Sequence, residues 1–182
     1  MAFSVPASKN FDIINTVEDE KFVQIFTSDN EAVQLTNNGR SIVSVKREIF
    51  AAALGVHLYS SGIHRIRTRI DKGYPFLGIR SHSIPPGIGP PLGDICISTP
   101  STYGWESQFR YINGRAYQNH WKIAARTDNV WTITLNCDKH RLHLIDENTN
   151  DEDEIEVDIN HAPLPWRFFI GLSRITGGIS LI

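Results

Sequence analysis

The sequence predicts an all-β protein, an antiparallel two-sheet β-sandwich. Three observations predict it: short runs in which apolar and polar residues alternate, turn residues between those runs, and a scarcity of helical patterns. Residues 64–70 (HRIRTRI) show the alternation, with Ile66 and Ile70 on one face of a strand and three arginines on the other. A period of two with one apolar face is typical of an antiparallel strand that covers a core.

The same alternation recurs along the chain. Residues 130–135 (VWTITL), 141–145 (RLHLI) and 154–159 (EIEVDI) each place their apolar residues on one side. Residues 45–54 (VKREIFAAAL) are compatible with either a helix or a strand, because the alanines favour helix while the pattern also permits strand. Further strands are expected at residues 22–26, 76–79, 168–172 and 178–182.

Turn residues separate the expected strands. Asn38-Gly39 and Asn113-Gly114 are Asn-Gly pairs, the strongest short hairpin signal. Residues 138–140 predict a tight hairpin, and residues 148–153 (NTNDED) a polar loop. Residues 83–93 contain four prolines and three glycines, which excludes a central strand and predicts an irregular surface loop. Many short strands joined in this way imply a sandwich or a barrel.

The length of 182 residues predicts one domain that buries roughly 70% of its unfolded surface. We expect a single β-sandwich domain over residues 21–182. Residues 1–20 carry the weakest pattern, and we expect them to form an N-terminal extension that either packs on the domain or frays.

Composition excludes several classes of function. Lys and Arg number 18 against 20 Asp and Glu, and the net charge of −2 argues against a whole-surface nucleic-acid binder. Two cysteines exclude a disulfide-stapled scaffold. The start shows no secretory pattern, and the longest apolar stretch, residues 49–56, is too short for a membrane helix. We therefore expect an intracellular, cytoplasmic protein with no membrane partner.

The motifs of common enzymes are absent from the sequence. It contains no Gly-x-Ser-x-Gly, Walker loop, His-Glu-x-x-His or Cys-x-x-Cys, so we predict no enzyme and no catalytic residues. His140 and His143 are three apart, which places them on opposite faces of a strand. His57 and His64 could approach each other across a turn, but no third ligand is evident. Because zinc needs three or four convergent ligands, we expect neither a metal nor a cofactor.

Two charged clusters admit a functional and a structural interpretation. Eight of the 20 acids lie within residues 146–158, which fits a calcium site, an acidic docking surface or a solvated hairpin tip. No glycine supports a calcium loop there, so the hairpin tip is favoured. Arg65, Arg67 and Arg69 form a row that suits either an anion or nucleic-acid platform or cross-strand pairing with the acidic row Glu154, Glu156 and Asp158. The pairing is favoured by the matching spacing.

The order of several short motifs resembles the B30.2/SPRY family over residues 55–182. They are Ser61-Gly62-Ile63-His64, Phe76-Leu77-Gly78-Ile79, Tyr103-Gly104-Trp105, Asn113-Gly114, the hairpin of residues 128–138, Pro165-Trp166, Gly171-Leu172 and the final Ile179-Ser180-Leu181-Ile182. The resemblance implies a bent, concanavalin-like or jelly-roll-like sandwich of two antiparallel sheets. It also implies a module that grips a protein or peptide with loops at one end, without catalysis or a cofactor. A neuralized-type or legume-lectin-like sandwich would give a similar string.

Three segments are the expected binding loops. Residues 80–93 and 105–121 are rich in Arg, His, Tyr and Pro, and the resemblance adds residues 173–177. Trp131 is expected in the core, and the resemblance implies that Trp105 and Trp166 pack beneath the loops. A fourth tryptophan follows a polar stretch and is expected to be exposed. The predicted partner-binding residues are Arg80, His82, Ile84, Tyr111, Tyr117, Trp121 and Arg174.

The sequence thus predicts a non-catalytic module that binds a protein or peptide ligand through a preformed loop surface. No nucleic acid and no membrane are expected as partners, and the sequence carries no signal for an oligomeric state. The alternative is a lectin-like, carbohydrate-binding domain with a shallow pocket built on Trp121, Asn119 and Arg115. An unpaired arginine row would instead point to nucleic acid, with strongly salt-dependent binding.

Overall fold

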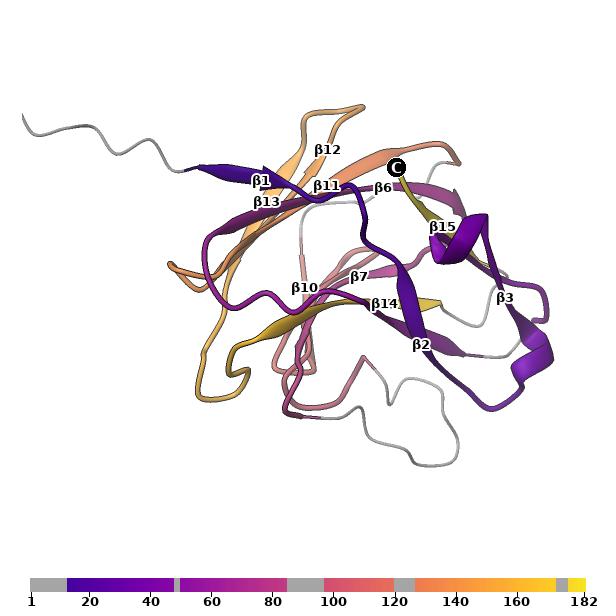
Figure 1. The fold of residues 1–182 in the computed structure, drawn as a ribbon, viewed down its shortest axis with the longest axis horizontal. Coiled ribbons are helices and arrows are strands. Elements are labelled where there is room, and N and C mark those ends of the chain that lie inside the picture. The colour runs from indigo at the N-terminus through magenta and orange to yellow at the C-terminus, as the bar shows by residue number, and fades with distance from the viewer. Residues whose placement is uncertain (1–12, 48–49, 85–96, 120–126, 173–176) are drawn as a thin grey trace, which may run out of the picture.

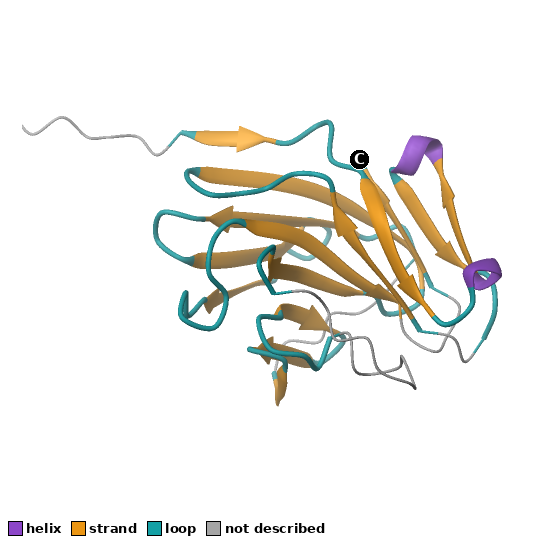
Figure 2. Ribbon diagram, turned by 60° about the horizontal axis from the view of Figure 1, so that its bottom comes forward, coloured by secondary structure: helices purple, strands orange, loops and turns teal. Residues whose placement is uncertain are grey.

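The computed structural model describes residues 13–47, 50–84, 97–119, 127–172 and 177–182. These residues form two sheets that pack face to face (Figures 1 and 2). All strand pairs are antiparallel except one at the N-terminal end. The predicted fold class, an all-β sandwich of two antiparallel sheets, is confirmed.

The first sheet, called sheet A, has the strand order β13-β12-β11-β6-β15-β4-β3. A further short strand, β1 (Ile14–Thr16), pairs in parallel with the start of β6. The other bounds are β3 (Val33–Thr36), β4 (Ser41–Ser44), β6 (Ile63–Lys72), β11 (Val130–Asn136), β12 (Arg141–Asp146), β13 (Glu152–Glu156) and β15 (Gly178–Leu181).

The second sheet, called sheet B, has the strand order β10-β9-β8-β7-β14-β5-β2. Two 3-10 helices, η1 (Asn30–Ala32) and η2 (Asn37–Gly39), flank β3 in the sequence. The strands of sheet B are β2 (Phe22–Thr27), β5 (Ala51–Gly55), β7 (Phe76–Ser81), β8 (Tyr103–Glu106), β9 (Phe109–Ile112), β10 (Arg115–Gln118) and β14 (Trp166–Leu172).

The alternation seen in the sequence places one face of the long sheet A strands β6, β11 and β12 in the core. Ile66 and Ile70 are buried from β6, and Ile133 from β11. The expected core position of Trp131 is confirmed, and Trp105 and Trp166 are buried as well, each of the three being exposed by 1% or less. The central strands β5, β7 and β14 of sheet B are buried on both faces, and their outer side carries a second apolar cluster. That cluster consists of Ala52, Leu54, Phe76, Ile97, Tyr111 and Phe169.

Burial on both faces also explains why residues 45–54 were ambiguous. The alanine-rich part of that segment forms β5, which lies between β2 and β14 and is buried along its whole length. A strand covered on both sides carries a continuous apolar run instead of an alternation. Its small alanine side chains therefore reflect the space between two covered faces, although alanine also favours helix.

Residues 13–20 pack on the domain. β1 lies beside the beginning of β6, and four residues later the side chain of Glu20 is buried. Its carboxylate accepts hydrogen bonds from the Tyr59 hydroxyl and from the Val56 backbone N–H at 2.7 Å. Burial and the negative charge of Glu20 together raise the pKa of Tyr59 well above its usual value. Gly55 is needed here, because a Cβ would approach a Glu20 oxygen to 2.6 Å.

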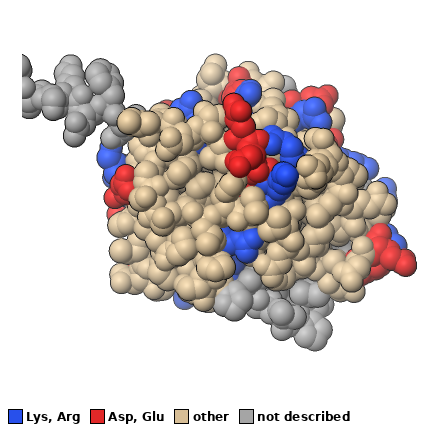
Figure 3. Space-filling model, in the orientation of Figure 1, with Lys and Arg blue, Asp and Glu red and all other residues tan. Residues whose placement is uncertain are grey.

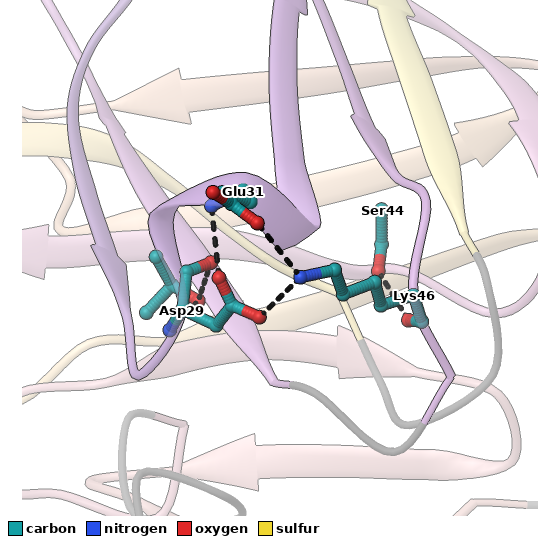
Figure 4. A network of polar contacts seen from close by, with 5 residues as sticks. Asp29, Glu31, Ser44 and Lys46 are labelled. Carbon is teal, nitrogen blue, oxygen red and sulfur yellow. Dashed lines mark hydrogen bonds and ion pairs between the residues drawn. The ribbon is translucent and has the colours of Figure 1, made fainter.

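An exposed polar network fastens η1 to the end of β4 (Figure 4). The Lys46 ammonium lies 2.7 Å from an Asp29 carboxylate oxygen and 3.3 Å from one of Glu31. The Glu31 backbone N–H donates to the other Asp29 oxygen at 2.9 Å, and the Ser44 hydroxyl donates to the Lys46 carbonyl at 3.1 Å. The hydrogen bond from Lys46 lowers the pKa of the Asp29 carboxyl.

Candidate binding surface at the hairpin of β9 and β10

Strands β8, β9 and β10 form a three-stranded meander at one edge of sheet B. The expectation of a long irregular loop over residues 105–121 is therefore wrong for residues 105–118. The Asn113-Gly114 pair forms the hairpin turn that its sequence predicts, with φ of 51° and 75° at its two residues. The sequence pattern does not predict these strands, because the face of β9 and β10 toward sheet A carries Arg110 and Tyr117. These two side chains do not form an apolar stripe.

The two faces of this meander have different environments. Tyr111 lies on the covered outer face of sheet B, where its ring meets that of Phe76 edge-on at a centroid distance of 5.4 Å. Its hydroxyl donates to a Glu106 carboxylate oxygen at 3.0 Å. Arg110 and Tyr117 are direct cross-strand neighbours and lie on the opposite face. The hairpin thus has one side fixed in a core and another side with polar groups.

One carboxylate ties this polar side to sheet A. Asp153 of β13 accepts a hydrogen bond from the Trp105 indole N–H at 2.7 Å and one from the Asn119 side-chain amide at 2.8 Å. It also receives both the Nε–H, at 3.0 Å, and an NH2 group of Arg110. Donors from β8, β9 and the residue after β10 therefore converge on a single side chain. We call this group the Asp153 cluster.

Beside the Asp153 cluster lies a depression of about 380 Å³, lined by Arg110, Ile112, Tyr117, Gln118 and Asn119. All four residues of β10 are exposed, and the Tyr117 side chain is the large aromatic group among them, with 48% of its surface accessible. The arginine and asparagine in the wall are held by Asp153, so their positions are set before any ligand arrives. A rigid hollow with an exposed aromatic ring suits binding through packing and a few polar contacts.

Two of the predicted contact residues are buried, which corrects the expectation that they reach a partner. Arg80 is 1% exposed in β7, a strand buried along its whole length. Its guanidinium donates to the hydroxyls of Thr99 and Thr102 and lies 5.4 Å from the ring centre of Phe169. Tyr111 is 7% exposed and packs in the second cluster. Both have polar tips whose partners lie inside the fold, so residue type alone suggested a surface role.

The remaining predicted contacts occupy different places. His82 is exposed and Ile84 is partly exposed, both on the turn after β7, where the His82 N–H donates to the Pro165 carbonyl at 2.9 Å. Tyr117 lines the depression. Trp121 and Arg174 lie outside the described residues. Tyr117 is thus the predicted contact that the structure places at this hollow.

Sequence reasoning missed Asp153, although a signal was present. In the acidic run of residues 146–158, Asp153 shares its strand face with Ile155, and the other acids of β13 face solvent. A lone acid on the apolar face of a strand must find donors inside the fold, because an unpaired buried charge is costly. Grouping Asp153 with the solvated hairpin tip concealed this distinction.

The expected pairing between the arginine row and the acidic row is also wrong. In sheet A, β11 and β12 lie between β6 and β13, so the two rows are not neighbours. The prediction fails because a matching spacing of charges does not determine which strands lie side by side. Arg67 instead pairs with Glu147, and Arg69 with Asp71 at 2.8 Å. The acids of β13 pair with β12: Glu154 lies 3.0 Å from Arg141, and Glu152 lies 3.0 Å from His143.

Charges of both signs lie near one another on one face of the molecule (Figure 3). On the face shown in Figure 3, Lys and Arg lie against Asp and Glu in small mixed groups, and most of the surface carries neither. Two of the three arginines in the β6 row are neutralised by carboxylates.

Among the described residues there is neither a cluster of metal-binding side chains nor a membrane-spanning helix. No group of three or more His, Cys, Asp or Glu side chains in this part of the chain is placed to hold a metal ion. Within the same residues, no helix has the length and apolar character to span a membrane.

Comparison with known proteins identifies the fold. No protein-family model matches the chain, and no curated protein matches it in sequence. Among solved structures, the TRIM65 PSpry domain superposes with a TM-score of 0.70 at 14% identity, over 92% of this chain and 91% of that one. The SPRY domain of human HERC1 gives a TM-score of 0.57 at 13% identity, over 84% and 95%. The fold is therefore SPRY-like, as the order of motifs predicts.

A third similar structure comes from a much longer chain. Stonustoxin superposes with a TM-score of 0.67 at 14% identity, over 92% of this chain but only 27% of its own. The same sandwich thus occurs as a separately solved domain and as part of a larger protein. Sequence identities this low establish the fold alone, so function has to be argued from the surface of this chain.

Proposed function

We propose that this protein is a non-catalytic module that binds a protein or peptide through the hairpin of β9 and β10. The observation that carries the proposal is Tyr117, an exposed aromatic ring beside a hollow whose walls are already fixed by the Asp153 cluster. Tyrosine is enriched at interface hot spots because it buries a large area at small entropic cost. The SPRY-like fold supports the proposal, because the resemblance implies a protein-interaction module.

The geometry suggests how a peptide is held. A side chain of the partner enters the hollow and packs on the Tyr117 ring. Among the described residues, β10 pairs only with β9, so its outer edge also offers backbone hydrogen bonds to an extended segment. Because Arg110 and Asn119 are positioned by Asp153, little reorganisation accompanies binding. His82, Ile84, Trp121 and Arg174 remain predicted contacts, and an intracellular, cytoplasmic location remains a prediction.

A selection from a displayed library of random peptides, followed by calorimetry on the selected peptides, tests the proposal. Tyr117→Ala is expected to weaken the selected peptides by about tenfold or more, the loss typical of an interface hot spot. Tyr74→Ala is the matched control, because Tyr74 lies between β6 and β7 and is similarly exposed, at 45% against 48%. Melting curves of both variants establish that each is folded.

The outcomes separate the surface from the function. Loss with Tyr117→Ala but not with Tyr74→Ala supports binding at the hairpin. Equal affinity in all three proteins would place the peptide elsewhere and refute the hairpin. Failure of every selected peptide to bind would count against the peptide-binding module itself.

The carbohydrate alternative gains no support from the described residues. Of the residues it needs, Asn119 lies in the wall of the hollow and donates one amide hydrogen to Asp153. Arg115 lies exposed on β10, and Trp121 lies outside the described residues. The protein or peptide ligand therefore stays the favoured one.

A further inference from the structure

The outer face of sheet A holds a second depression, about 350 Å³ in volume and separate from the hairpin. Its floor consists of three neighbouring strands, β6, β11 and β12. It shares no residue with the hollow beside Tyr117. The lining side chains are Arg65, Arg67, Thr132, Thr134, His143, Ile145 and Glu147.

The strand register arranges these side chains in two rows. In the first row, Thr132 lies between Arg67 and Ile145, with Glu147 just beyond β12. Glu147 receives the Arg67 Nε–H at 2.9 Å and an NH2 group at 2.7 Å, and it also receives the Thr132 hydroxyl. Hydrogen bonds from Arg67 and Thr132 lower the pKa of Glu147 to about 2. The polar groups of this row satisfy one another.

The second row is not satisfied in the same way. There Thr134 lies between Arg65 and His143. Among the described residues, the Arg65 side chain has no hydrogen-bond or ion-pair partner, and its Nε–H is buried. Only the Nε of this guanidinium is buried without a partner, so its terminal NH2 groups are the donors that a ligand in the depression can reach.

The charges in the depression define what fits it. Arg65 and Arg67 contribute two positive charges, and Glu147 contributes one negative charge. His143 lies 3.0 Å from Glu152, which is not part of the lining. The two arginines and one glutamate of the lining leave one positive charge over, which matches the single charge of a carboxylate. A phosphate group with nearly two negative charges would meet the fixed charge of Glu147 in the same hollow.

We propose that this depression is a carboxylate-binding site in which Arg65 holds the anion and Thr134 donates a second hydrogen bond. An arginine presents two parallel N–H groups to a carboxylate, and such charge-assisted pairs are the strongest hydrogen bonds of this kind. The ligand is an acidic side chain of a peptide or a free small acid. The site goes beyond the hairpin surface and does not depend on it.

The test follows the side-chain Nε–H signals of arginine by nuclear magnetic resonance during titration of the intact chain. The probes are the capped peptide acetyl-Thr-Glu-Thr-amide, its glutamine counterpart, glutarate, and inorganic phosphate. Comparison with Arg65→Gln identifies the Arg65 signal. Arg69→Gln is the matched control, because Arg69 lies on the same face of β6 but already pairs with Asp71.

We expect saturable movement of the Arg65 signal with the glutamate peptide or with glutarate. The probe that binds reports whether the acid belongs to a peptide or is free. Arg65→Gln should weaken that binding by about tenfold, Thr134→Val by less, and Arg69→Gln should leave it unchanged. Melting curves establish that the variants fold, and Tyr117→Ala should bind these probes like the wild type.

Three results would overturn the assignment. One is the absence of a saturable response to either carboxylate probe. Another is an equal response to the glutamine peptide, which would show that the charge is not recognised. The third is tighter binding of phosphate than of either carboxylate. None of these results bears on peptide binding at the hairpin, which is measured with other ligands and another variant.

Discussion

The Asp153 cluster and the network around Lys46 join similar groups in different surroundings. Asp153 is 14% exposed and links the two sheets, whereas the Lys46 and Glu31 side chains are 45% and 88% exposed and link two neighbouring segments. Water screens the second set, and long side chains lose entropy when they are held there. The number of ion pairs therefore says little about the free energy of unfolding, because the burial of each pair decides how much it contributes.

Asp153→Ala should cause the largest loss of stability in this comparison. It leaves the Trp105 N–H and the Arg110 guanidinium without their carboxylate, and we expect the free energy of unfolding to fall by about 2–4 kcal/mol. Urea unfolding measures the change. Glu154→Ala is the control, since it removes an exposed pair from the same strand. Equal midpoints for the two variants would contradict the role given to burial.

Glu20→Gln extends the comparison to the buried carboxylate of the N-terminal segment. The amide keeps one acceptor oxygen, but its NH2 group replaces the oxygen that accepts either from the Val56 N–H or from the Tyr59 hydroxyl. We expect a loss of about 1–2 kcal/mol in the free energy of unfolding. Thermal unfolding followed by circular dichroism measures it, and a melting temperature equal to that of the wild type would argue that these hydrogen bonds contribute nothing.

The ion pair of Glu147 with Arg67 should show its effect through pH. The pKa of Glu147 is lowered from 4.5 to about 2, so the ionised form is favoured in the folded state. Its contribution is therefore complete above pH 4.5 and disappears as pH falls toward 2. Since Glu147 is about one third exposed, we expect at most about 1 kcal/mol.

Urea unfolding of the wild type and of Glu147→Gln across this pH range measures that contribution. The difference in free energy between them should narrow as pH falls from 4.5 to 2. A difference that stays constant with pH would show that the charge on Glu147 plays no part.

Lys46→Ala should have the smallest effect. Its partners Asp29 and Glu31 are solvated, and η1 keeps the hydrogen bond from the Glu31 backbone N–H to the Asp29 carboxylate. We expect the melting temperature to stay within experimental error of the wild type at physiological salt. A clear drop in the melting temperature would show that this exposed network stabilises the end of β4 more than its solvent exposure implies.

The sequence predicts the fold well where a strand has one apolar, buried face. Residues 130–135 show the pattern plainly, and they form most of strand β11, as expected. Prediction failed where a polar residue lies on the inner side, as with Arg110, Tyr117 and Asp153 at the edge of the sandwich. A local pattern records which residues share a face, but it does not reveal which distant strand supplies their partners.

The candidate site was predicted only in part for the same reason. Tyr117 was named from residue type and position, and it lines the hollow. Arg80 was named on the same grounds, yet it is buried beside Thr99 and Thr102. Long-range partners decide between these outcomes. Depressions such as the one over Arg65 depend on strand order, which short motifs do not specify.

The parallel strand β1 pairs with the part of β6 that contains Arg65, a residue of the carboxylate-binding depression. Thr16 is paired with Arg65, and the Val17 N–H donates to the Arg65 carbonyl at 2.9 Å. The three residues of β1 have exposed side chains, so little apolar area opposes their local detachment. Their amide hydrogens should therefore exchange with solvent faster than those in the middle of β6. Detachment of β1 would leave the backbone of Arg65 paired with β11 alone. The hydrogen bonds of Glu20 limit this detachment, because they hold the residues that follow β1 to the sandwich.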